Sequence, residues 1–197
     1  MPPTDGDHGV GRAHDDGVAR LTHARHHGDV DVGIGFAAIR PRQDADRCPT
    51  GCLGTAAGRF HHPAPPTADQ NGASARNLME ALRTLFPYRR LITVLGASSD
   101  HVTPELLTAL LSGTHRAIAT KTRHPRAATP EWIREQAAEL GFEMEVSPAV
   151  PEALALALAD ASAEDLICCT GSVFVAAEAR IAWFVRQGAS LPPSDPI

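Results

Sequence analysis

Residues 71–187 are predicted to form an α/β domain with three α/β/α layers and a Rossmann-like, mainly parallel sheet. Short apolar runs such as Leu91–Leu95 and Leu166–Cys169 have the length and composition of strands that are buried on both faces. Segments with apolar residues at helical spacing lie between these runs. Because strands and helices alternate along the chain, we expect right-handed crossover connections in one sheet.

The predicted central strand lies in the stretch Arg90–Asp100, which reads RLITVLGASSD. Its apolar residues end at Gly96, and a small polar loop follows. Open α/β sheets bind their ligands at the carboxyl ends of the strands, where strand tips and helix N-termini meet. Functional residues are therefore expected at this end of the sheet.

Three helices are predicted around this strand. The first is expected to begin with Ser74 as its N-cap and to stop before Pro87, with apolar residues at helical spacing between them. The second and third each begin with a threonine N-cap, a proline at the first helical position and a glutamate in the first turn. These two starts are Thr103-Pro104-Glu105 and Thr129-Pro130-Glu131, and the helices close at Gly113 and Gly141.

The rest of the domain follows the same alternation. We expect strands at residues 116–120, 142–146 and 166–169, a helix at residues 152–159 that Pro151 opens, and a last helix at residues 173–185. Residues 188–197 are expected to be a tail.

The segment 1–66 differs sharply in composition and is predicted to be low-complexity and disordered. It is rich in Gly, Asp, His, Arg, Pro and Ala, with hardly an aromatic residue and no sustained period. One possible strand is Val30–Ile39; the Gly33-x-Gly35-x-x-Ala38 pattern inside it is not followed by a helical pattern and does not predict a dinucleotide site. The composition also fits GC-rich coding DNA that is translated out of frame.

No metal site is predicted. Seven histidines and the pair Cys48 and Cys52 lie in the first 62 residues, but a zinc site commonly needs a second closely spaced Cys or His pair held by structure. Cys168 and Cys169 are adjacent in a predicted buried strand and are expected to be free thiols that pack in the core.

Charge and hydropathy exclude several classes of protein. A net charge of −5 and a pI near 6.0 provide no broad basic surface for nucleic acid. No apolar run approaches the roughly 18 residues that span a bilayer, and the N-terminus lacks the order of a signal peptide. A cytoplasmic protein without nucleic-acid or membrane partners is expected.

Three stretches, RRLITVLGASSD, ATKTRHPRAA and EDLICCTGSVFVAAEAR, together resemble the C-terminal domain of folylpolyglutamate synthase and dihydrofolate synthase in the Mur ligase superfamily. The resemblance covers about Asn71 to Arg180 and implies a glutamate ligase domain. It implies ATP and Mg²⁺ as cofactors, glutamate and folate or pteroate as substrates, and an acyl phosphate intermediate.

The family carries its P-loop in a central domain, and no G-x-x-x-x-G-K-[ST] occurs in this sequence. The chain is therefore expected to be a truncated ligase that does not catalyse ligation alone. The family also enters this domain through an apolar strand and Asp-Gly-Ala-His-Asn, where this chain has Thr67 and Gln70 at the Asp and His positions. The resemblance stops at Asn71, as a frameshift, truncation or fusion junction would make it do.

The resemblance nominates binding residues but no catalytic residue. Ser172 is expected near the glutamate, or else is an ordinary helix N-cap. The basic loop with Arg123, His124 and Arg126 is expected to receive carboxylates, or else is a solvated loop. Asn71 and Asp100 are expected on the nucleotide side, where His101 stands in place of the family's usual lysine.

Three functions remain open from the sequence. The chain is an inactive piece of a folate-glutamate ligase, a half-site that a separate central ATPase domain completes, or a non-catalytic α/β module that binds a small acidic ligand or a protein.

Overall fold

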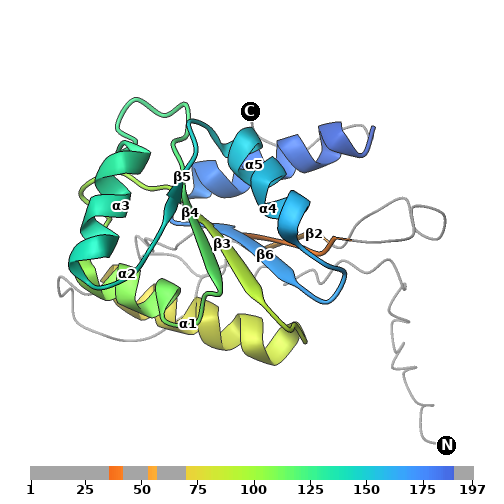
Figure 1. The fold of residues 1–197 in the computed structure, drawn as a ribbon, viewed down its shortest axis with the longest axis horizontal. Helices are drawn as coiled ribbons and strands as arrows, with labels where there is room; N and C mark the ends of the chain where they lie inside the picture. Colours follow the sequence, from red (N-terminus) through yellow and green to blue (C-terminus); the bar gives the residue numbers. More distant parts are fainter. Residues whose placement is uncertain (1–35, 42–52, 57–69, 189–197) are drawn as a thin grey trace, which may run out of the picture.

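The computed structural model describes residues 36–41, 53–56 and 70–188, which build a six-stranded mixed sheet with five helices (Figure 1). The strand order is β2-β1-β6-β3-β4-β5. The last four strands in this order run parallel to one another, whereas β1 is antiparallel to both of its neighbours. The strands are β1 (Phe36–Ile39), β2 (Leu53–Ala56), β3 (Leu91–Leu95), β4 (Arg116–Ala119), β5 (Glu145–Val146) and β6 (Leu166–Thr170).

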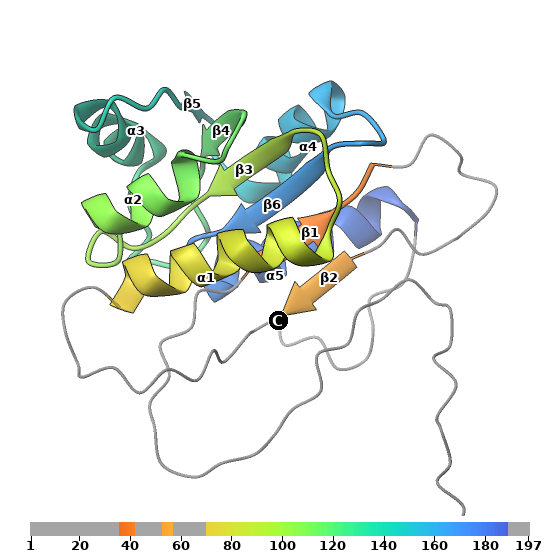
Figure 2. The same ribbon diagram turned by 90° about the horizontal axis from the view of Figure 1, so that it is seen from below.

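The helices cover both faces of the sheet, so the predicted three-layer α/β/α fold is confirmed. α1 (Gln70–Leu85), α2 (Pro104–Leu111) and α3 (Pro130–Glu139) contribute to one buried cluster with Leu91 and Leu95 of β3. α4 (Val150–Asp160) and α5 (Val173–Arg186) pack on the opposite face against the alternate residues Ile92 and Val94. Figure 1 shows α4 and α5 above the sheet and α1 and α2 below it, and Figure 2 shows α1 in front of the strands. No described helix is long and apolar enough to cross a membrane.

The predicted caps of α2 and α3 are confirmed. Thr103 Oγ1 accepts a hydrogen bond from the backbone N–H of Leu106, and Thr129 Oγ1 accepts one from Trp132. Each bond satisfies an N–H group that has no partner within the first helical turn. These two helices therefore begin where the local sequence rules place them.

Two predicted boundaries are wrong. α1 begins at Gln70, so Ser74 lies inside the helix and is not its cap. In the first turn, Gly72 is buried and the Asn71 side chain donates to the carbonyl of His101, and these tertiary contacts stabilise a turn that intrinsic propensity does not favour. β5 keeps only two of the five predicted strand residues. The backbone N–H of Phe142 instead donates to Ala137, and Gly141 has a φ of +82°, which together close α3.

The prediction that residues 1–66 form no ordered structure is wrong for β1 and β2. Residues 36–39 of the possible strand Val30–Ile39 form β1, whose side chains are buried on both faces of the sheet between the two helical layers. β1 pairs with β6, so its stability depends on a strand far along the chain. The histidines and cysteines considered for a metal site lie outside the described residues, as do Gly33, Gly35 and Thr67.

Candidate functional site

A crevice forms where the connections of two neighbouring parallel strands diverge. β3 and β6 lie side by side in the sheet, but β3 leads to α2 on one face and β6 leads to α5 on the other (Figure 1). Open α/β sheets bind ligands at such a switch point, outside the carboxyl ends of the strands. The predicted location of function thus coincides with the crevice that the topology creates.

Two glycines keep the strand tips close together. The N–H of Gly96 donates to the carbonyl of Thr170 at 3.1 Å. Gly171 has a φ of +98°, and a Cβ there would lie 2.6 Å from Cδ1 of Leu95 and 2.8 Å from the carbonyl oxygen of Gly96. Only glycine fits at position 171 without strain, so this residue shapes the floor of the crevice.

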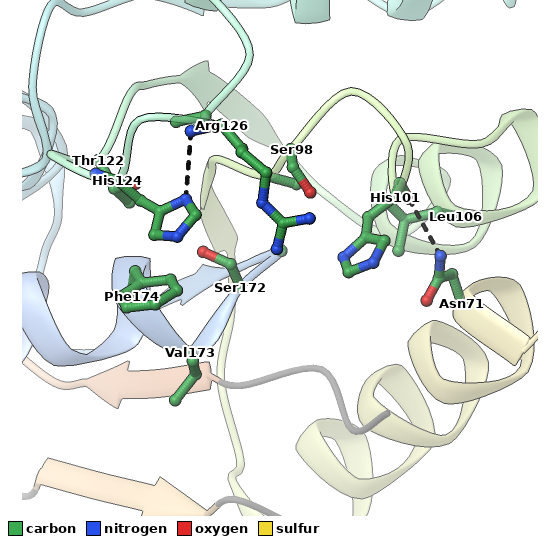
Figure 3. Close-up of a pocket in the computed structure, with 13 residues that line it drawn as sticks. Asn71, Ser98, His101, Leu106, Thr122, His124, Arg126, Ser172, Val173 and Phe174 are labelled. Atoms are coloured by element: carbon green, nitrogen blue, oxygen red, sulfur yellow. Dashed lines mark hydrogen bonds between the residues drawn. The ribbon is translucent and has the colours of Figure 1, made fainter. Parts of the chain in front are cut away.

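The crevice contains a pocket of about 220 Å³ (Figure 3). Loops after β3, β4 and β6 line it together with the starts of α1 and α5, and no described lining residue is acidic. One arginine and two histidines line it, so the pocket suits an anion. Its lining residues are Asn71, Ala97, Ser98, His101, Leu106, Thr122, His124, Arg126, Ala127, Gly171, Ser172, Val173 and Phe174.

Ser172 is both a helix cap and a pocket residue. Its Oγ accepts a hydrogen bond from the backbone N–H of Val175 at 3.2 Å, which starts α5. A hydroxyl has one donor and two acceptor positions, so capping leaves its O–H able to donate into the pocket. The ordinary N-cap interpretation is therefore confirmed, and the binding interpretation remains compatible with it.

The loop after β4 places His124 and Arg126 on the pocket. His124 Nδ1 accepts a hydrogen bond from the backbone N–H of Arg126 at 3.3 Å, and the backbone N–H of His124 donates to the buried Thr122 hydroxyl at 3.3 Å. The His124 ring stacks on Phe174, with ring centroids 4.5 Å apart. Figure 3 shows the Arg126 side chain extending between Ser172 and His101.

Arg123 lies elsewhere, so the expected basic cluster is divided. Its backbone N–H donates to Glu178 Oε1 at 2.9 Å, and the residue lines a separate groove between α4 and α5 rather than the pocket. The loop bends at Arg123 and His124 and then turns, so neighbouring residues face different cavities, which composition alone does not reveal. The structure thus brings His124 and Arg126 together on the pocket and places Arg123 on the groove.

The nucleotide-side candidates are also separated. Asn71 lines the pocket, and its Nδ2 donates to the carbonyl of His101 at 3.4 Å. The Asp100 side chain is 60% exposed, lies 3.7 Å from Nε2 of His101 and is not among the lining residues. A hydrogen bond from Ser98, with smaller contributions from His101 and Arg126, lowers the pKa of Asp100.

Several pocket residues were not predicted. Phe174 is 46% exposed at the pocket rim, and Ser98 and Thr122 lie on the loops after β3 and β4. Ser98 belongs to the loop where function was expected. The sequence also offered a signal for Phe174, because this aromatic residue lies two positions after the predicted cap Ser172. Thr122 carried no signal, because its role depends on the loop's folded path.

The described residues hold no Mg²⁺ site, and the crevice pocket is too small for a whole nucleotide. They contain no group of three or more His, Cys, Asp or Glu side chains that could hold a metal ion. A pocket of about 220 Å³ is also below the roughly 300–1,000 Å³ typical of small-molecule sites. The crevice pocket by itself thus has room for a ligand smaller than a nucleotide.

Comparison with known proteins identifies the fold and the family. Residues 70–173 match the family described as Mur ligase, glutamate ligase domain. A probable bifunctional folylpolyglutamate synthase/dihydropteroate synthase of Halobacterium salinarum is 34% identical over 113 residues, which is 57% of this chain and 13% of that protein.

Two solved structures are also similar. E. coli FolC in complex with DHPP and ADP is 27% identical, with a TM-score of 0.52, over 59% of this chain and 27% of that chain. Mycobacterium tuberculosis folylpolyglutamate synthase complexed with ADP is 25% identical, with a TM-score of 0.51, over 62% and 29%. This chain therefore spans well under a third of these proteins.

The matched residues contain β3, β4, β6 and the glycine-rich tips that form the crevice, and they include more than half of the chain. The resemblance found in the sequence is thereby confirmed, and this protein belongs to the Mur ligase glutamate ligase domain family.

Proposed function

We propose that this chain forms the glutamate-binding wall of a folate-glutamate ligase site and that its pocket binds the carboxylates of L-glutamate. The observation that carries the proposal is the pocket at the switch point, which combines Arg126, His124 and Ser172 and has no described acidic lining residue. The family match supports a glutamate ligand, and the FolC and folylpolyglutamate synthase neighbours support a folate-related acceptor.

The chemistry of the pocket suits a carboxylate. The Arg126 guanidinium offers paired N–H donors that match the two oxygens of a carboxylate, and such charge-assisted bonds are stronger than neutral ones. The Ser172 hydroxyl and the N-terminus of the 14-residue helix α5 add further donors to the pocket.

Ligation needs more than this wall. The solved neighbours hold ADP, but this sequence has no P-loop, and the described residues form no Mg²⁺ site. We therefore propose that the chain alone binds glutamate without hydrolysing ATP. Mixing it with a separately produced ATPase domain of a folate ligase tests the half-site function: glutamate-dependent ATP hydrolysis in the mixture alone supports a half-site, and its absence favours a non-catalytic binding module.

Arg126→Ala tests the site directly, and Arg123→Ala is its matched control. Both variants remove one exposed arginine from the same loop, but only Arg126 lines the pocket. We expect Arg126→Ala to weaken L-glutamate binding about tenfold or more, because a charge-assisted pair is lost. Arg123→Ala is expected to change it by less than about twofold, which is typical of a screened surface charge.

Isothermal titration calorimetry measures the dissociation constant of L-glutamate for each variant. Equal losses in the two variants would show that the loop acts only through its net charge. The absence of saturable L-glutamate binding by the unmodified chain would contradict the proposed function.

A further inference from the structure

Helix α5 holds the loop after β4 at two points. Glu178 Oε1 accepts the backbone N–H of Arg123 at 2.9 Å, and the Phe174 ring stacks on His124 with centroids 4.5 Å apart and planes 25° apart. Phe174 and Glu178 are four residues apart, so they lie on the same face of α5. One helix face thus contacts two consecutive residues of the loop.

The other end of this loop is attached to a different element. The backbone N–H of Ala128 donates to the carbonyl of Ala97 at 2.9 Å, and an isolated bridge joins Ala127 to Ser98 in the loop after β3. His124 and Arg126 therefore lie between an attachment to α5 and an attachment to the β3 loop. Their positions on the pocket depend on both attachments.

Glu178 makes its contact without adding negative charge to the pocket. The residue lines the groove between α4 and α5 together with Arg123, and it is not among the residues that line the pocket. Its bond to the Arg123 N–H fixes the backbone immediately before His124. The contact explains why Arg123 lies on the groove while the next residue lies on the pocket.

We propose that Glu178 and Phe174 are positioning residues that hold His124 and Arg126 at the pocket. The proposal deepens the proposed function and rests on it for its ligand readout. Besides beginning at the Ser172 cap, α5 would therefore hold the loop after β4 in the conformation that places His124 and Arg126 on the pocket.

Glu178→Ala and Glu178→Gln test the proposal, with Glu139→Ala on the exposed end of α3 as the control. In the unliganded chain, we expect Glu178→Ala to speed hydrogen exchange of the Arg123 amide about tenfold and to shift the His124 ring proton resonances, because a charge-assisted bond is lost. Glu178→Gln keeps a neutral acceptor, so smaller changes of both readouts are expected. L-glutamate binding is expected to weaken in the same order, and Glu139→Ala is expected to change none of these readouts.

Phe174→Leu is a second variant that does not depend on Glu178. Phe174 is 46% exposed, so the substitution leaves the core intact. We expect it to speed hydrogen exchange of the Arg126 amide, which donates to the His124 ring, while the Arg123 amide stays protected.

Unchanged His124 resonances and Arg123 exchange in Glu178→Ala would overturn the proposal. A uniform rise in exchange across the whole sheet would also overturn it, because that result indicates a general structural role. If the unmodified chain binds no L-glutamate, the proposed function fails, whereas the two measurements on the unliganded chain still decide whether Glu178 and Phe174 position the loop.

Discussion

Gly171 shows how much of the pocket depends on a single residue. It combines a positive φ with atoms of Leu95 and Gly96 inside the radius that a Cβ would need. Gly141 also has a positive φ, of +82°, but no atom lies within 4 Å of the position a Cβ would take. Substitution of each glycine therefore distinguishes the cost of backbone strain alone from the cost of strain combined with steric overlap.

We expect Gly171→Ala to lower the free energy of unfolding by about 2–5 kcal/mol, because it adds steric overlap to backbone strain. Gly141→Ala is expected to cost about 1 kcal/mol from backbone strain alone. Urea denaturation of both variants measures the difference. Equal losses would mean that the strand tips move apart easily.

Single residues also show what the sequence can reveal of a site. Asn71, His124, Arg126 and Ser172 were predicted and do line one pocket, because loops at the carboxyl ends of parallel strands meet there. Arg123 was assigned to the same cluster, but its direction depends on a hydrogen bond to a residue 55 positions away. No local pattern encodes such a contact.

Helix starts are the elements that local sequence describes best. Thr103, Thr129 and Ser172 each accept the backbone hydrogen bond that an N-cap makes. Ser172 differs from the other two because its helix begins at the pocket. Its contributions to stability and to binding can therefore be measured separately.

We expect Ser172→Ala and Thr129→Ala each to lower the free energy of unfolding by about 1 kcal/mol, the usual cost of a lost N-cap. Only Ser172→Ala is expected to weaken L-glutamate binding as well, because Thr129 caps a helix whose start does not line the pocket. Thermal unfolding measures the loss of stability, and calorimetric titration measures the affinity for L-glutamate. An unchanged glutamate affinity in Ser172→Ala would restrict this serine to capping.

The two short strands near the N-terminus are the elements that the sequence predicted least well. β2 was missed and β1 was only partly anticipated, because four-residue strands in a polar, glycine-rich context carry little periodic signal. α1 starts before Ser74 because its first turn is stabilised by tertiary contacts, such as the bond from Asn71 to the carbonyl of His101, rather than by a local cap. Local rules thus predicted the parallel part of the sheet and failed at its antiparallel edge.

The whole molecule depends on β1 more than its composition suggests. Ile39 is almost completely buried between β6 and the α4–α5 layer, and the Arg40 guanidinium donates to the carbonyl of Pro87 before β3. These contacts attach the N-terminal strand to the domain that the family match covers. β1 is therefore part of the core, although it lies upstream of the matched residues.

Substitution of Ile39 tests this dependence. We expect Ile39→Ala to lower the free energy of unfolding by about 2–4 kcal/mol, because it leaves a cavity in the core. Leu156→Ala on α4, where the side chain is 42% exposed, is expected to cost less than about 1 kcal/mol. Chemical denaturation compares the two, and a negligible loss in Ile39→Ala would show that β1 does not contribute to the stable fold.

The amino ends of the parallel strands are joined by a charged network. Arg90, just before β3, binds the buried Asp165 before β6 with a shortest N–O distance of 2.7 Å, and it also donates to the carbonyl of Asp160. The guanidinium holds the pKa of Asp165 well below its usual range. The network lies at the opposite end of the sheet from the pocket, so it stabilises the fold without contacting the site.

The depressed pKa sets the direction of the pH dependence. The contribution of Asp165 to stability is fully present above the unfolded-state pKa of about 3.9 and is lost as the pH falls below it. We expect Asp165→Asn to cost about 3 kcal/mol at pH 7 and to flatten the loss of stability between about pH 5 and pH 2. Chemical denaturation at each pH measures the free energy of unfolding. Asp160→Asn is the control, because it removes a carboxylate from a side chain that is 45% exposed.

The position of β1 determines when the sheet can be completed during synthesis. Phe36 pairs with Thr170, so during synthesis β1 cannot pair with β6 until residue 170 has left the ribosome. β3 also lacks one of its two neighbours until that moment. Pairings of such high contact order form slowly and leave strand edges exposed in the meantime. A nascent chain that stalls before residue 170 therefore presents one open edge of β1 and one open edge of β3 to chaperones.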